Sequence, residues 1–269
     1  LASLLLSDTE AAPLESPDRP WRFAIVPQLT PVELLRNWSA ILQQLGKAGI
    51  DCQLVLYPDI AKFEVEFLRG QADFVYLNPY HMVMAHERHA YQPLLHDKRA
   101  LEGLLLTQAD GPVSRIEQLQ QQRISFPSAN AFAASLYLRA LLERQHHVGF
   151  QAHYAQNHRN ALRQVLTGDS AACGVVATTF ESETADVKAR LRVLLRTPAV
   201  APHPIAAHPR VPLATRQRLS DTLLHFANTE AGQPLMQAIA MPHPVAADYR
   251  SDYAPLLKLH IEHYVVNAD

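Results

Sequence analysis

Polar and aromatic side chains follow a short apolar stretch near residue 75, a pattern typical of a ligand-binding strand end. The segment Asp73–Tyr80 reads D-F-V-Y-L-N-P-Y. Val75–Leu77 is apolar enough for a strand buried on both faces, and Pro79 ends it because proline cannot donate to a sheet. Asn78 and Tyr80 therefore stand at the carboxyl end of the strand, where open α/β sheets bind ligands. The segment predicts one wall of a ligand cleft.

Two predicted helix starts offer further polar groups. Ser128 or Asn130 can cap an apolar helix that follows, whose free N–H groups and positive dipole end favour an anion. His158, in N-H-R-N-A-L, opens another helix. A helix N-terminus lowers the pKa of an imidazole and a bound anion raises it, so a ligand could draw a proton to His158. An ordinary capped helix and a surface histidine are the plain alternatives.

Metal binding has weaker support, although the chain contains 14 histidines. A specific helical site would place two histidines four residues apart beside an acid, and no such pair occurs. His86 and His89 lie three apart, and His81 lies five residues before His86. We interpret the other close histidines as solvated helix faces: His146 with His147, and His260 with His263. We therefore expect no bound metal.

Catalytic motifs are also missing from the sequence. Neither G-x-G-x-x-G nor G-K-[ST] occurs, and Gly168–Ala172 lacks the second glycine of a hydrolase nucleophile elbow. We expect no cofactor and no catalytic residues, so binding is favoured over an enzymatic activity.

The composition is typical of a globular protein, and its charge balance does not favour binding to nucleic acid or anionic lipid. The 269 residues are 48% hydrophobic and 19% charged, with a formal net charge of −2. This balance provides no basic surface for nucleic acid or anionic lipid. The sequence contains no run of about 18 apolar residues, the length that would be needed to span a membrane. The opening L-A-S-L-L-L-S is either the remnant of a signal peptide or a docked N-terminal segment.

Strand and helix patterns alternate in two series, which predicts an α/β fold with two lobes. The first series breaks near His96–Leu101, and the Pro-rich segment Pro198–Pro212 follows the second. We expect mostly parallel sheets with helices on both faces. Cys52 and Cys173 fall on strands of different lobes, where a disulfide would hinder movement between the lobes. Two buried free thiols are therefore expected.

The expected residue limits follow from these two breaks. We expect an N-terminal leader over residues 1–21, a discontinuous first lobe over 22–100 and 198–269, and a second lobe over 101–197.

Several segments, taken in order, resemble a known family. They are R-F-A-I-V-P-Q at Arg22–Gln28, Y-P-D at Tyr57–Asp59, Y-L-N-P-Y, G-L-L-L-T-Q-A-D-G-P-V followed by I-E-Q-L, I-S-F, N-H-R-N-A-L and Y-A-P-L. Their order resembles the phosphate/phosphite/phosphonate solute-binding proteins of ABC importers. The resemblance implies a two-lobed, type II periplasmic-binding-protein clamp that closes on a small ligand. It also implies a periplasmic location, with or without a membrane tether, and a monomer that meets a membrane permease.

The pocket departs from this family at several positions. Family members carry hydroxyl residues that grip phosphonate oxygens where this chain has Ala131, Phe132 and Ala133, so only the backbone amides remain. A tyrosine of the family is replaced by Ile60. His158 matches the family's oxyanion-binding histidine.

Two acids of the phosphonate binders are replaced as well. His203 stands where one carboxylate holds a ligand amine, and Thr178 replaces a second acid. An aminoalkylphosphonate therefore fits poorly. A different oxyanion, or a larger polar molecule stacked on Phe132 and Tyr80, fits these residues better.

We thus expect a solute-binding protein that captures a small oxyanion for an ABC importer. A sensor of the same fold that signals to a membrane kinase or cyclase, and a biosynthetic enzyme on the same fold, are the alternatives. The expected ligand-binding residues are Gln28, Tyr76, Asn78, Tyr80, Asn130, Ala131, Phe132, Ala133, His158, Thr178 and His203.

Overall fold

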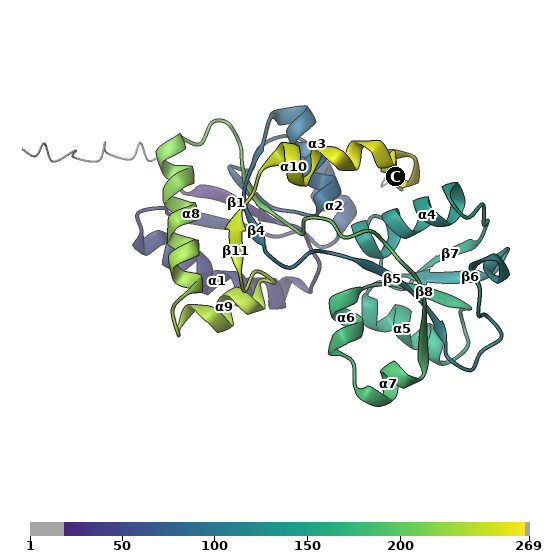
Figure 1. Ribbon diagram of the computed structural model, residues 1–269. Helices are drawn as coiled ribbons and strands as arrows, with labels where there is room; N and C mark the ends of the chain where they lie inside the picture. Colours follow the sequence, from purple (N-terminus) through teal and green to yellow (C-terminus); the bar gives the residue numbers. More distant parts are fainter. Residues whose placement is uncertain (1–18, 267–269) are drawn as a thin grey trace, which may run out of the picture.

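Two separate β-sheets form the centres of two lobes, joined by crossing segments of the chain (Figure 1). The computed structural model describes residues 19–266. The opening apolar segment, expected as a signal remnant, lies outside the described residues, as does most of the expected leader. The prediction of a two-lobed α/β fold is confirmed, because no strand is shared between the sheets.

The first lobe contains a six-stranded sheet in the order β11-β4-β10-β3-β1-β2. Its strands are β1 (Trp21–Ile25), β2 (Cys52–Val55), β3 (Phe74–Tyr76), β4 (Gln92–Asp97), β10 (Ile205–Ala207) and β11 (Pro244–Ala246). Its helices are α1 (Pro31–Lys47), α2 (Ile60–Phe67), α3 (Pro79–His89), α8 (Leu213–Ala227), α9 (Gly232–Ala238) and α10 (Tyr249–Asp252), followed by the 3-10 turns η3 (Ala254–Leu259) and η4 (Ile261–Tyr264).

The second lobe contains a five-stranded sheet in the order β7-β6-β8-β5-β9. Its strands are β5 (Gly103–Gln108), β6 (Arg123–Phe126), β7 (Gln151–Tyr154), β8 (Ala172–Val176) and β9 (Leu191–Arg196). Its helices are the 3-10 turn η1 (Ile116–Leu119), the π-helical turn η2 (Phe132–Tyr137), α4 (Leu138–Arg144), α5 (His158–Leu166), α6 (Ala177–Ser182) and α7 (Ala185–Ala189).

Both sheets are mixed. In the first lobe β1 runs parallel to β2 and β3, whereas β10 is antiparallel to β3 and β4. In the second lobe β6 is parallel to β7 and β8, whereas β5 is antiparallel to β8 and β9. The antiparallel strands β5 and β10 are the first that the chain forms after it crosses into each lobe. Each of these strands follows a crossing segment and not a helix of its own lobe, so no βα crossover requires it to run parallel to its neighbours.

Strands β4, β10 and β11 were not expected from the sequence. They are short or contain proline, and β10 lies within the Pro-rich stretch that we interpreted as a crossing segment. The chain leaves the first sheet after Asp97 and returns after Arg196. We keep the division into 22–100 with 198–269, and 101–197, as a proposal.

Side-chain caps fix the helix starts that face the other lobe. Asn78 caps α3 by accepting a hydrogen bond from His81 N at 2.8 Å, and Asn157 caps α5 in the same way from Asn160 N at 2.8 Å. The expected capping by Ser128 or Asn130 is wrong. Ala131 is the N-cap of η2 and has no side-chain acceptor, and the Asn130 amide instead donates to Glu64 of the first lobe.

Both cysteines are free, as expected. Cys173 is buried, whereas Cys52 is only half-buried because β2 is an edge strand of its sheet. Burial nevertheless raises the pKa of the Cys52 thiol to about 12. Among the described residues, no helix is long and apolar enough to cross a membrane.

Two glycines let η2 lie directly against the second sheet. A Cβ at Gly103 would lie 2.1 Å from Ala133 O, and one at Gly174 would lie 2.1 Å from Ala134 O. Both contacts are far shorter than van der Waals distances, and the atoms they meet are backbone. The absence of two side chains in β5 and β8 therefore sets the position of η2.

We expect Gly174→Ala to lower the free energy of unfolding by about 2 kcal/mol or more, because the new methyl group must push η2 off the sheet. Gly46→Ala is the matched control, since a Cβ at this helical position has nothing within 4 Å. That change should raise stability by about 0.5–1 kcal/mol. Urea unfolding of both variants measures the difference, and equal stability would contradict this account of the packing.

Candidate functional site

Strand ends and helix starts of the two lobes meet along their facing surfaces. Asn78, which follows β3 and caps α3, is 3% exposed. Its Nδ2 donates to the backbone oxygen of Asn130 in the second lobe at 3.4 Å. The two predicted residues that stand at a strand end and a helix start are therefore in direct contact across the lobes.

His203 lies on the segment that returns to the first lobe and belongs to the same region. Its ring stacks on Tyr76 with centroids 5.7 Å apart, and its Nε2 lies 2.5 Å from Gln28 Nε2. Burial lowers the pKa of His203 to about 3, with further lowering by His81 and His158. The imidazole is thus neutral at pH 7, and Nε2 can accept a hydrogen bond from the Gln28 amide.

His158 opens α5 in the second lobe, near His203. Burial lowers its pKa to about 4, and its Nδ1 is enclosed with no hydrogen-bond partner. A charge on His158 disfavours a charge on His203, so the two imidazoles lie within electrostatic reach of each other. Both predicted histidines are therefore neutral, and one retains an unused polar atom.

Glu64 and His81 complete this region and were missed as site residues in the sequence. Glu64 lies on α2 and is 8% exposed, and its Oε1 is 2.8 Å from His81 Nε2. Asn130 Nδ2 lies 3.1 Å from Oε1 and 2.9 Å from Oε2 of the same carboxylate. The only sequence signal was the place of Glu64 beside Phe63, on the face that α2 buries.

The C-terminal segment makes a third connection between the lobes (Figure 1). Asn130 Nδ2 donates to Val266 O at 2.9 Å, and Val266 N donates to Asn130 Oδ1 at 3.0 Å. Arg139 donates to Tyr264 O, and Arg144 Nη1 donates to Leu259 O at 2.8 Å. The side chain of Asn130 is consequently engaged by Glu64 of the first lobe and by this segment.

The remaining predicted residues are distributed unevenly. Phe132 and Ala133 are 3% and 2% exposed and belong to the core that the first lobe shares with η2, whereas Ala131 is half-buried. Tyr80 is 8% exposed, and burial, with the nearby carboxylates Glu262 and Glu64, raises its pKa to about 12. Phe132 and Tyr80 therefore offer little free ring surface in this closed arrangement.

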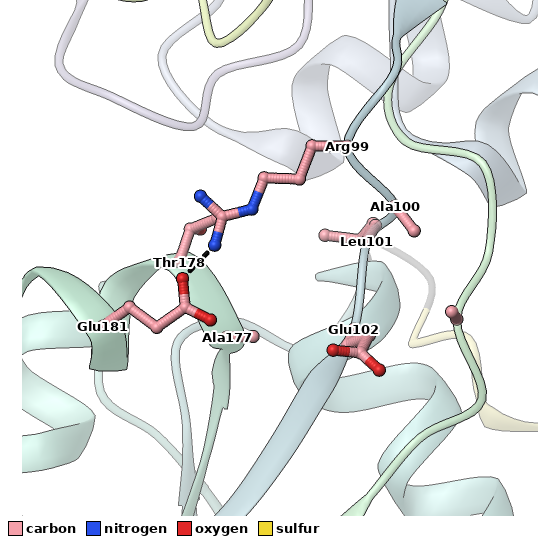
Figure 2. Close-up of a pocket in the computed structure, with 8 residues that line it drawn as sticks. Arg99, Ala100, Leu101, Glu102, Ala177, Thr178 and Glu181 are labelled. Carbon is pink, nitrogen blue, oxygen red and sulfur yellow. Dashed lines mark hydrogen bonds and ion pairs between the residues drawn. The ribbon is translucent and has the colours of Figure 1, made fainter.

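Thr178 lines a pocket of about 280 Å³ beside the crossing segments (Figure 2). Arg99 from the first crossing segment pairs with Glu181 of α6 in this pocket, and Glu102 lies beside them. None of the other predicted ligand-binding residues lines it. The Arg99–Glu181 pair ties the crossing segment to the second lobe.

A two-lobed α/β clamp with polar strand ends and helix starts gathered between its lobes defines the class of periplasmic-type substrate-binding proteins. The family model described as "ABC transporter, phosphonate, periplasmic substrate-binding protein" matches residues 23–253. The chain belongs to this family of ABC importer components. No curated protein matches the chain in sequence.

Several solved structures share the fold of this chain. PhnD1 from Prochlorococcus marinus (MIT 9301), in complex with methylphosphonate, superposes with a TM-score of 0.76 at 12% identity, over 91% of this chain and 98% of that one. A binding-protein component of an ABC phosphonate transporter from Pseudomonas aeruginosa has a TM-score of 0.74 at 12% identity, over 92% and 88%. A protein from Xanthomonas citri bound to ATP has a TM-score of 0.74 at 17% identity, over 91% and 99%.

The lowered histidine pKa values predict that acid destabilises the protein between about pH 6.5 and pH 4. His158 and His203 titrate near 4 and 3 in the folded chain, but near the ordinary value of 6.5 when unfolded. The unfolded chain therefore binds protons first, and stability present above pH 6.5 is lost as pH falls. Each imidazole contributes up to about 1.4 kcal/mol of loss per pH unit in this window.

Urea unfolding at pH 7 and pH 5 tests this expectation. His203→Gln should show a smaller loss between the two pH values than the unchanged protein. His225→Gln, at an exposed position on α8, should show the same loss as the unchanged protein. Parallel losses in all three proteins would mean that His203 does not carry the pH dependence.

Proposed function

We propose that this protein captures a small phosphoryl or phosphonyl oxyanion between its lobes and presents it to the permease of an ABC importer. Membership in the substrate-binding family supports the role, and one observation supports the site. Asn78 of the first lobe bonds Asn130 of the second, and His158 of the second lobe lies within electrostatic reach of His203 on the returning segment. A ligand that contacts both lobes would favour the closed form.

The enclosed Nδ1 of His158 is the main reason to propose an anion. A buried polar atom without a partner is unfavourable, and a ligand oxygen would satisfy it. An anion would also raise the pKa of His158 above its ligand-free value of about 4, so that binding takes up a proton. The backbone amides of Asn130 to Ala133 are proposed to replace the family's hydroxyl groups.

Glu64 restricts which anions fit. Its carboxylate lies beside Asn130 and would repel a bound anion, but hydrogen bonds from Asn130 and His81 already occupy its oxygens. A ligand of low charge, or one whose charge is shared with a protonated His158, is therefore favoured over a fully ionised phosphate.

We further propose that the protein acts as a monomer in the periplasm and releases its ligand chemically unchanged. Incubation with the ligand followed by mass spectrometry of the recovered compound tests the absence of turnover.

Calorimetric titration with methylphosphonate, phosphite, phosphate and ATP tests the ligand class. We expect saturable binding of at least one of these compounds, with one site per chain. ATP is included because a relative of the same fold holds it and because it carries phosphoryl oxygens. Failure of all four to bind would contradict the proposed ligand class.

His158→Ala should weaken binding of that compound by about ten- to a hundredfold, because it removes a charge-assisted hydrogen bond of about 1.5–3 kcal/mol. His225→Ala, at an exposed position on α8, is the control and should bind normally. Affinity should also fall as pH rises through the pKa of His158 in the complex, since the neutral imidazole loses its charge.

A flat affinity between mildly acidic and mildly alkaline pH would exclude this mechanism. It would favour a ligand held by stacking, in which case Phe132→Ala should weaken binding more than His158→Ala does.

A further inference from the structure

The C-terminal turn η4 brings three potential metal ligands together on the surface. His260 precedes η4 and has a left-handed backbone with φ of 47°, and Glu262 and His263 follow within the turn. The sequence spacing lacks the four-residue separation of a helical histidine pair, which is why we interpreted His260 and His263 as a solvated helix face. The chain reversal at His260 instead turns the two rings and the carboxylate toward each other.

The ligand atoms of these side chains are close to a coordinating arrangement. Glu262 Oε1 lies 3.3 Å from His260 Nδ1 and 3.9 Å from His263 Nε2, and all three ligand atoms lie within 4.8 Å of one another. Ligands at about 2.0–2.2 Å from a tetrahedral Zn²⁺ are separated by about 3.3–3.5 Å. Small side-chain rotations would therefore suffice to close the arrangement around an ion.

The surroundings favour such an ion. The three side chains are 54%, 55% and 73% exposed, which leaves an open position for water as a fourth ligand. Within residues 19–266, the only basic side chains within 4 Å of the Glu262 carboxylate are those of these two histidines. Two imidazoles and one carboxylate suit a borderline cation such as Zn²⁺ better than Ca²⁺ or Mg²⁺, which prefer oxygen ligands alone.

The backbone that carries the ligands is held on both sides. Arg144 donates to Leu259 O just before the turn, and Arg139 donates to the O atom of Tyr264, the last residue of the turn. Asn130 and Val266 exchange two hydrogen bonds further on. A fixed backbone reduces the conformational entropy that metal binding must overcome.

We propose that His260, Glu262 and His263 form a binding site for a divalent transition-metal ion of the Zn²⁺ class. The site lies on the segment that joins the first lobe to α4, so a bound ion would hold this segment in its docked position. None of its three ligands belongs to the proposed oxyanion site, and neither assignment depends on the other.

Calorimetric titration of the whole chain with ZnCl₂, in a buffer that does not chelate zinc, tests the site. We expect one ion per chain. Titration with Co²⁺ should also produce the visible absorption of a tetrahedral complex. Glu262→Gln and His263→Asn should each weaken zinc binding at least about tenfold.

The matched control replaces another neighbouring histidine pair, with His146→Asn and His147→Asn combined. Asparagine tolerates the left-handed backbone of His147, which has φ of 55°. This variant should bind zinc like the unchanged protein. The proposal is overturned if the unchanged protein binds no zinc at micromolar concentrations, or if Glu262→Gln and His263→Asn both bind it undiminished.

Discussion

The side chain of Asn130 is the contact on which the closed arrangement depends. Its amide bonds the Glu64 carboxylate of the first lobe and the backbone of Val266, while its own backbone oxygen accepts from Asn78. Residues that are far apart in the chain, in α2, α3 and the C-terminal segment, thus converge on one residue at the start of η2. Since Asn130 is only 4% exposed, loss of this amide would leave several buried polar groups unsatisfied.

The position of Asn130 is itself a consequence of backbone packing. η2 lies so close to the second sheet that only glycine fits at positions 103 and 174. This approach brings the first turn of η2 to the edge that faces the first lobe, where Phe132 and Leu136 join the core of that lobe. The same packing therefore supports both the closed lobes and the location of the proposed ligand site.

Electrostatics in this region favour uncharged imidazoles and one carboxylate that is heavily hydrogen-bonded. Burial keeps His158 and His203 neutral at pH 7, whereas Glu64 accepts hydrogen bonds from His81 and Asn130. A histidine that is neutral without ligand and charged with it couples binding to proton uptake.

The sequence by itself determined the two α/β lobes, most of the strands and helices, and the family. These features depend on the local periodicity of apolar residues, on helix caps such as Asn78 and Asn157, and on the order of the motifs. All three can be recognised in the sequence alone. The sequence also predicted a shared ligand site for His158 and His203, and this assignment stays a proposal.

Only the tertiary structure decided the contacts that depend on residues distant in sequence. Strands β4, β10 and β11 obtain their hydrogen bonds from strands far along the chain, so their short and proline-containing segments carry no local signal. Glu64 bonds Asn130 and His81 because the fold of the two lobes brings these three residues together, and Thr178 lines a pocket with the crossing segments because α6 begins beside them. Local sequence specifies which residues can make hydrogen bonds, but the packing of the two lobes determines which partners they find.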